Sequence, residues 1–230
     1  MEEPAKPEPP IVGTAGVTAA AAYDATIAST AATSTIPYTI KQIKTSAELQ
    51  ASLSSLTSLL QDCVNPDPAT SSIGFLAPLS DPEADSYWQS LSANLQAEPL
   101  TFYLFVLLAP ATSEDGSPAS PSLSSSRVLA SVQIFTIAKR THAHRAEVAK
   151  LLVRPGSRRL GLGRRLMAHV EAFARNELGR ELLTLDTASR TPAREFYARL
   201  GWLEWGTCPE YADYADGKRG DATFFVKFLR

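Results

Sequence analysis

The most constraining feature of this 230-residue chain is a basic, glycine-spaced turn between an apolar run and an amphipathic segment. The turn reads Arg-Arg-Leu-Gly-Leu-Gly over residues 158–163. The run from Val148 to Val153 predicts a buried strand before it, and the spacing from about Arg164 to Leu178 predicts a helix after it. Such a junction gathers free backbone N–H groups at the positive end of a helix dipole. The turn is therefore suited to hold a pyrophosphate.

Hydrophobic periodicity around this turn predicts an α+β chain with a mixed sheet. Ser46 is expected to cap the first long helix, and Ser80 or Asp81 to begin the second. A last helix is expected from about residue 190 or 191 to Leu200, ended by Gly201. The predicted strands are 38–44, 101–109, 127–138, 144–153, 181–188, 202–207 and 222–230. The resulting order is β-α-α-β-β-β-α-β-α-β-β.

Two segments depart from this pattern. Residues 1–36 consist mainly of Ala, Thr, Ser, Pro and Gly, and their few large side chains cannot offset the entropy lost on ordering, so they predict a disordered low-complexity leader. Residues 110–126 are polar and contain proline, which predicts a flexible loop insertion between two strands. Residues 37–230 are expected to form one folded domain.

Composition excludes several classes of protein. The net charge of −2 gives no excess that would attract nucleic acid or an anionic membrane. Cys63 and Cys208 lie far apart, and His142 and His144 have no third ligand near them, so no metal is expected. No run reaches the roughly 18 to 20 apolar residues that span a bilayer, and the start resembles no signal peptide. We expect a cytoplasmic protein, with the nucleus as an alternative.

These motifs resemble those of the GCN5-related N-acetyltransferase (GNAT) family. The family's acyl-CoA signature, Gln or Arg, two residues, Gly, one residue, then Gly or Ala, is met by Arg158, Gly161 and Gly163. The run AEVAKLLVRPGSRRLGLGRRLM is followed by LLTLDT and then by AREFYARLGW, which is similar to the family's fourth helix. The chain looks most similar to tabtoxin-resistance-like, small-molecule acetyltransferases. The resemblance implies the acyl-CoA N-acyltransferase fold, a mostly antiparallel seven-stranded sheet flanked by about four helices.

The resemblance also implies acetyl-CoA as the co-substrate. The backbone of the fourth strand would bond the pantetheine arm, and the turn would cradle the pyrophosphate, with Gly161 and Gly163 permitting close approach and positive φ angles. Many relatives place an Asn on the cofactor arm where this chain has Arg190, which could instead meet a phosphate or an acidic substrate. The predicted cofactor-binding residues are Leu151, Val153, Arg158, Arg159, Leu160, Gly161, Leu162, Gly163, Arg164 and Arg190.

Two residues take the positions of catalytic groups in relatives. Tyr197 would act as general acid toward the departing thiolate, because a phenol is matched to that proton transfer, although it could simply pack on the sheet. Glu147 would act as general base, with Asp186 as the alternative. Strand alternation puts Glu147 on the side of Val153 unless a bulge shifts the register, and Glu147 could instead pair with a basic neighbour or bind the substrate amine.

The acceptor is less defined by these patterns. Trp88, Asp186 and Tyr211 are candidates to line its site, although aromatic residues at these spacings are more often core. We expect transfer of acetyl to a primary amine of a small molecule by direct attack in a ternary complex, since the motif contains no cysteine that could form an acyl-enzyme. A protein N-terminal or lysine acetyltransferase and a non-catalytic CoA-binding module are the alternatives. The chain would act as a monomer or a homodimer.

Overall fold

The structure is a computed structural model that describes residues 38–71, 74–112, 118–119 and 122–230. The predicted leader at 1–36 lies outside the described residues, as do 113–117 and 120–121 of the predicted insertion. Two short stretches within that insertion, β3 (Ala111–Thr112) and β4 (Pro118–Ala119), form a separate two-stranded sheet. In the described residues, no helix is both long and apolar enough to cross a membrane.

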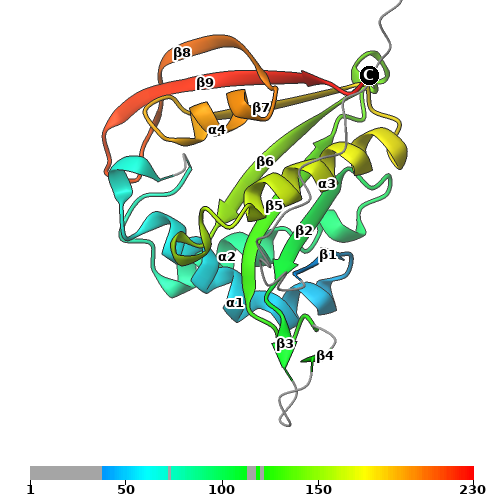
Figure 1. Ribbon diagram of the computed structural model, residues 1–230, viewed down its shortest axis with the longest axis vertical. Helices are drawn as coiled ribbons and strands as arrows, with labels where there is room; N and C mark the ends of the chain where they lie inside the picture. The colour runs from blue at the N-terminus through cyan, green and yellow to red at the C-terminus, as the bar shows by residue number, and fades with distance from the viewer. Residues whose placement is uncertain (1–37, 72–73, 113–117, 120–121) are drawn as a thin grey trace, which may run out of the picture. The chain divides into compact units, whose positions relative to one another are not determined.

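A seven-stranded mixed sheet organises the rest of the described chain in the order β1-β2-β5-β6-β7-β9-β8 (Figure 1). Only β6 and β7 run parallel, and every other neighbouring pair is antiparallel. The strands are β1 (Thr39–Ile43), β2 (Phe102–Leu108), β5 (Val128–Thr136), β6 (Arg145–Val153), β7 (Leu182–Ala188), β8 (Leu203–Asp213) and β9 (Arg219–Phe228).

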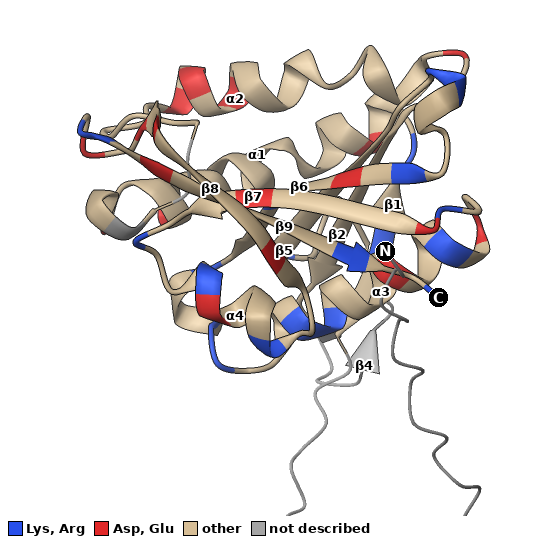
Figure 2. Cartoon of the chain, turned by 90° about the horizontal axis from the view of Figure 1, so that it is seen from above, with Lys and Arg blue, Asp and Glu red and all other residues tan. Residues whose placement is uncertain are grey.

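Helices cover both faces of this sheet (Figure 2). One face carries α1 (Ser46–Val64) and α2 (Asp81–Ser90), and the other carries α3 (Leu162–Asn176) and α4 (Ala193–Arg199). Short 3₁₀ turns lie at Pro68–Thr70, Asn94–Gln96, Arg140–His142 and Pro155–Ser157. The predicted fold, a mostly antiparallel seven-stranded sheet with four flanking helices, is confirmed for the described residues.

Capping chemistry sets where the first helices begin. The Thr45 hydroxyl accepts the Glu48 N–H at 3.1 Å and the Glu48 carboxylate accepts the Thr45 N–H at 3.2 Å, so Thr45 is the cap. The predicted cap at Ser46 is wrong by one residue, because Ser46 is already the first helical residue. A second capping box, between Ser80 and Glu83, begins α2 at Asp81 as expected.

The two later helices differ from their predicted bounds for backbone reasons. Gly161, at φ 76°, is the cap of α3, so this helix begins at Leu162 rather than near Arg164. Pro192 is the cap of α4, which therefore begins later than predicted, at Ala193. The structure thus places Gly161 directly before the first turn of α3.

A bulge in β6 decides which side chains face which helices. Lys150 has φ 50°, and two residues, Lys150 and Leu151, lie opposite the single residue Val132 of β5. Val148 therefore packs in the core under α3, whereas Leu152, four positions later, packs in the core under α1 and α2. By alternation, Glu147 faces the α1–α2 side, opposite to Val153, which packs against the α3 core. The exception that was allowed for a bulge therefore applies, and the two residues do not share a side.

Candidate active site

The parallel strands β6 and β7 separate after three residue pairs. They are paired over residues 145–147 of β6 and 182–184 of β7, and the rest of β6 has no pairing with β7 (Figure 1). The Arg154 N–H donates to the Leu129 carbonyl of β5 at 2.9 Å, so by alternation the N–H and carbonyl of Val153 point away from β5, toward the gap. The gap therefore offers strand backbone of the kind that bonds an extended ligand.

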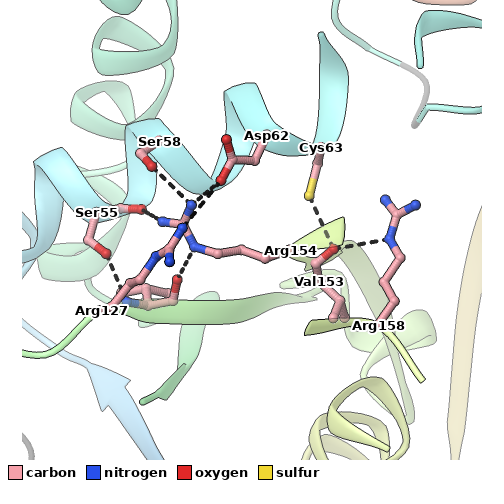
Figure 3. Close-up of polar contacts among 9 residues, drawn as sticks. Ser55, Ser58, Asp62, Cys63, Arg127, Val153, Arg154 and Arg158 are labelled. Atoms are coloured by element: carbon pink, nitrogen blue, oxygen red, sulfur yellow. Dashed lines mark hydrogen bonds and ion pairs between the residues drawn. The ribbon is translucent and has the colours of Figure 1, made fainter. Parts of the chain in front are cut away.

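Protein groups already engage the Val153 carbonyl. It accepts from Arg158 Nε at 3.3 Å and from Cys63 Sγ at 3.5 Å (Figure 3). Burial raises the pKa of the Cys63 thiol to about 11, so it stays protonated and able to donate. The N–H of Val153 is consequently the group at this position that suits a ligand carbonyl.

The turn before α3 has the form of an anion site. Gly161 contributes no capping side chain, and the first N–H groups of the helix, on Leu162, Gly163 and Arg164, have no intrahelical acceptor. A Cβ added to Gly161 would meet no atom within 4 Å, so the space in front of the turn is open. Backbone N–H groups and a helix dipole thus face a space that an anion can enter.

The two glycines of the turn have different roles. Gly161 has the positive φ that was predicted, but Gly163 does not. A Cβ on Gly163 would lie 3.2 Å from Phe196 Cζ and 3.6 Å from Val153 Cγ2, so its small size lets α3 pack against α4 and β6. Arg159, at φ 65°, is the second left-handed residue of the turn.

The other turn residues divide by exposure. Arg159, Leu160 and Arg164 are exposed, whereas the Leu162 side chain is 1% exposed in the α3 core. Leu162 can therefore reach a cofactor only through its backbone. Lys and Arg gather on the α3–α4 side of the sheet (Figure 2), which favours an anion there.

Arg154 does not belong to this exposed basic set, although it is close in sequence. It is 3% exposed, forms an ion pair with Asp62, and donates to the Val128 carbonyl at 2.7 Å and to Ser58 Oγ at 2.9 Å (Figure 3). Arg154 therefore fastens α1 to β5 and to the end of β6, and its charge is not available to a phosphate.

Asp62→Asn is expected to lower the free energy of unfolding by about 2 kcal/mol, because it leaves the buried Arg154 guanidinium without its counter-charge. Chemical denaturation measures this change. Glu195→Gln is the matched control, since Glu195 forms an exposed ion pair with Arg199 at 3.2 Å and should change stability by at most about 0.5 kcal/mol. Equal losses in the two variants would contradict the role given to Arg154.

Two carboxylates share the α1–α2 side of the sheet at the point where β6 and β7 separate. Asp186 of β7 faces the same side as Glu147, because its neighbour Leu185 packs in the α3 core. Burial raises the pKa of Glu147, and the charge of Asp186 raises it further. Burial likewise raises the pKa of Asp186, while the charge of Lys150 lowers it. Each carboxylate is therefore a stronger proton acceptor than in water.

Lys150 and Tyr211 border these carboxylates. Lys150 Nζ lies 5.0 Å from the centroid of Phe75, a residue that packs against the α1–α2 core, and burial lowers its pKa. The Tyr211 ring meets Phe224 edge-on at 5.2 Å, and Phe224 is the cross-strand partner of Asp186. The carboxylates thus have a cationic neighbour on one side and an exposed aromatic wall on the other.

Tyr197 approaches the same strands from the opposite face. Its ring packs against Phe225 at 5.8 Å and Trp202 at 6.0 Å in the α3 core. Burial, and then the charge of Asp186, raises the pKa of this phenol far above its ordinary value. The phenol therefore stays protonated.

Two candidates from the sequence do not lie where they were expected. Trp88 is 0% exposed within the core under α1 and α2, so the expectation that it lines an open acceptor site is wrong. Arg190 pairs with Asp216 at 2.9 Å and stacks on Tyr214 at 4.1 Å from the ring centroid. These contacts connect Arg190 to the β8–β9 turn rather than to the cofactor gap.

Three features of the site escaped the sequence patterns. The left-handed conformations of Lys150 and Arg159 have no residue signal, because glycine usually takes such φ values. The docking of Ala77 on the β8–β9 turn, through a 2.9 Å bond to the Ala215 carbonyl, joins segments far apart in the chain. The sequence of the arginine-rich turn also gave no sign that Arg154 is buried while the neighbouring arginines are exposed.

Comparisons with known proteins identify the family and the fold. The model of the acetyltransferase (GNAT) family matches residues 86–202, just over half of the chain. Similar solved structures include a candidate phosphinothricin N-acetyltransferase, with 18% identity, a TM-score of 0.58 and coverage of 84% of this chain and 99% of that chain.

Two further solved structures share the fold. A candidate acetyltransferase from Salmonella typhimurium, solved with its cofactor acetyl-CoA, is 17% identical with a TM-score of 0.57, covering 84% of this chain and 95% of that chain. The ribosomal-protein-S5-alanine acetyltransferase from Vibrio fischeri is 13% identical with a TM-score of 0.62, covering 84% and 93%. The family match and the shared fold together show that this chain belongs to the GNAT acetyltransferase family.

Proposed function

We propose that this protein transfers the acetyl group of acetyl-CoA to a primary amine of a small molecule, by direct attack in a ternary complex. The observation that carries the proposal is the opening between β6 and β7, which has an anion-binding turn at its α3 end and two carboxylates on the α1–α2 face. The open space before Gly161 fits the pyrophosphate of CoA, and the N–H of Val153 fits its pantetheine arm.

The residues of this opening supply each proton transfer that the reaction needs. Glu147, with its raised pKa, accepts a proton from the ammonium or the attacking amine. Backbone N–H groups of Leu151 or Val153 donate to the thioester oxygen as it gains negative charge. Tyr197 donates its hydroxyl proton to the departing thiolate as the carbon–sulfur bond breaks and the carbon–nitrogen bond forms. The products are the acetylated amine and CoA thiol.

The surroundings of the carboxylates support a small acceptor. The Ala77 N–H donates to the Ala215 carbonyl at 2.9 Å, so the segment before α2 meets the β8–β9 turn on this face of the sheet. Tyr211, Phe224 and Trp205 form an aromatic strip beside Asp186, in which Tyr211 meets Phe224 edge-on at 5.2 Å between ring centroids and Trp205 meets it at a tilt at 5.6 Å. Such a strip gives contact area for a compact organic amine.

Release of CoA thiol from acetyl-CoA in the presence of single amines tests this proposal. The panel contains phosphinothricin, spermidine and a peptide with an N-terminal alanine, chosen to represent an amino acid analogue, a polyamine and a protein end. Turnover of either small amine supports the proposal. Turnover of the peptide alone would establish a protein acetyltransferase, and CoA binding without turnover of any amine would favour a binding module.

Tyr197→Phe is expected to lower kcat by about 100-fold while leaving the Kd for CoA within about twofold, since the phenyl ring keeps the core contacts and loses only the proton donor. Steady-state kinetics and calorimetric titration with CoA measure the two effects. Tyr103→Phe is the control, because Tyr103 packs on Phe173 at 5.2 Å and lies outside the site. Equal losses of turnover and CoA affinity in Tyr197→Phe would rule out the general-acid role.

A further inference from the structure

Arg190 lies in the short connection between β7 and α4, and all its described contacts reach the β8–β9 turn. Its guanidinium lies 4.1 Å from the centroid of the Tyr214 ring and forms an ion pair with Asp216 at 2.9 Å. Burial alone would raise the pKa of Asp216, but hydrogen bonds from the Lys218 backbone and the Arg190 side chain lower it below its ordinary value. The Asp216 carboxylate in this ion pair is therefore charged. Arg190 therefore covers one tyrosine and pairs with the next acidic residue of the same turn.

Tyr214, the tyrosine that Arg190 covers, is buried and hydrogen-bonded within the β8–β9 hairpin. Tyr214 is 1% exposed, its hydroxyl donates to the Asp221 carbonyl, and it accepts the Ser189 N–H at 3.1 Å. Its ring lies so close to Gly220 that a Cβ there would come within 2.6 Å. Tyr214 thus joins both arms of the β8–β9 hairpin to the end of β7, directly beside Arg190.

The same hairpin carries the aromatic wall of the proposed acceptor site. Between Cys208 and Ala212 the pairing of β8 with β9 is irregular, Glu210 has φ 50°, and its N–H donates to the Asp221 carboxylate at 3.0 Å. Tyr211 lies within this irregular stretch, and its ring contacts Phe224, the cross-strand partner of Asp186. The position of Tyr211 therefore depends on how the turn three residues later is held.

The β8–β9 turn also contacts the segment before α2, which borders the proposed acceptor site on the side of Lys150. The Ala215 carbonyl, between Tyr214 and Asp216, accepts the Ala77 N–H at 2.9 Å, and Ala215 is 1% exposed in the core shared with α1 and α2. Lys150 packs against Gly74 and Phe75, which begin the segment before α2. The same segment is bonded at Ala77 to the β8–β9 turn that Arg190 contacts.

We propose that Arg190 is a positioning residue for the acceptor side of the site, acting through Tyr214 and Asp216 on Tyr211 and on the segment before α2. This inference rests on the proposed acetyl transfer to a small amine. It replaces the sequence-based expectation that Arg190 contacts the cofactor. Loss of the planar guanidinium should loosen the turn and weaken acceptor binding, while the distant pyrophosphate turn keeps its geometry.

Arg190→Ala tests this proposal in the full-length protein. The KM for phosphinothricin or spermidine is expected to rise about tenfold, with the Kd for CoA changed by less than about twofold. Arg190→Lys keeps the charge but loses the planar stacking surface, so it should restore only part of the acceptor affinity. Amide hydrogen exchange should accelerate in residues 209–218 and stay unchanged in 151–165, a readout that needs no acceptor.

Arg194→Ala is the matched control. Arg194 forms an ion pair with Glu204 at 2.8 Å, joins α4 to β8 with similar exposure, and does not touch the β8–β9 turn. It should leave the acceptor KM and the exchange of residues 209–218 unchanged. Weaker CoA binding by Arg190→Ala without faster exchange in the turn would overturn the proposal and restore the cofactor role. Failure of every amine to react, with the exchange result as expected, would count against the proposed function alone.

Discussion

Gly161→Val is expected to weaken CoA binding by at least about 100-fold, measured by calorimetric titration. The isopropyl group would project into the open space before the first turn of α3, where the pyrophosphate must approach the N–H groups of Leu162 and Gly163. A valine at φ 76° also carries backbone strain of about 1 to 2 kcal/mol, which would shift the turn away from its anion-binding shape.

The control for this strain lies at the other end of the same helix. Gly179 has φ 61°, and a Cβ added there also meets no atom within 4 Å. Gly179→Val should therefore lower the free energy of unfolding about as much as Gly161→Val but keep the affinity for CoA. Retained CoA affinity in Gly161→Val, or an equal loss in both variants, would remove the phosphate-cradle role from this turn.

Glu147→Gln is expected to lower kcat by about 100-fold or more, because the amide cannot accept the amine's proton. In this variant, the fall of kcat/KM at low pH should also disappear. A base acts only when deprotonated, and burial raises the pKa of Glu147, so kcat/KM of the natural protein should fall with decreasing pH at a higher pH than an ordinary glutamate would impose. A pH series of initial rates for both proteins measures this.

Asp186→Asn distinguishes the two carboxylates that share this face. If Glu147 is the base, Asp186→Asn removes a negative neighbour, so the acidic limb should move to lower pH while persisting. If Asp186→Asn instead abolishes the limb and Glu147→Gln keeps it, Asp186 is the base and Glu147 serves to hold the substrate amine.

The fold could be predicted because its signals are local. Alternation and three- to four-residue spacing predicted every strand of the main sheet and all four described helices in the right order, and the glycine turn lies directly before α3 as expected. Errors of one to three residues occurred at Thr45, Leu162 and Ala193, where the conformation of a cap decides the boundary. The larger error is in β8, which runs to Asp213 instead of ending at residue 207.

The site was less predictable, because its geometry depends on contacts between distant segments. The bulge at Lys150 reverses the face that Glu147 presents, and no residue near it carries the usual glycine signal. Arg154 and Trp88 have sequence contexts compatible with a ligand site, yet the packing of α1 and α2 buries both.

The sequence by itself determined the turn at 158–163, the order of helices and strands around it, and hence the family. Backbone N–H groups at a glycine-capped helix start depend only on local conformation, which nearby residues encode. Only the tertiary structure decided that β6 and β7 separate beyond Glu147, that Glu147 and Asp186 share one face, and that Arg190 holds the β8–β9 turn. Strand register, burial and ion pairing arise when segments far apart in the chain pack together, and a local pattern does not contain that information.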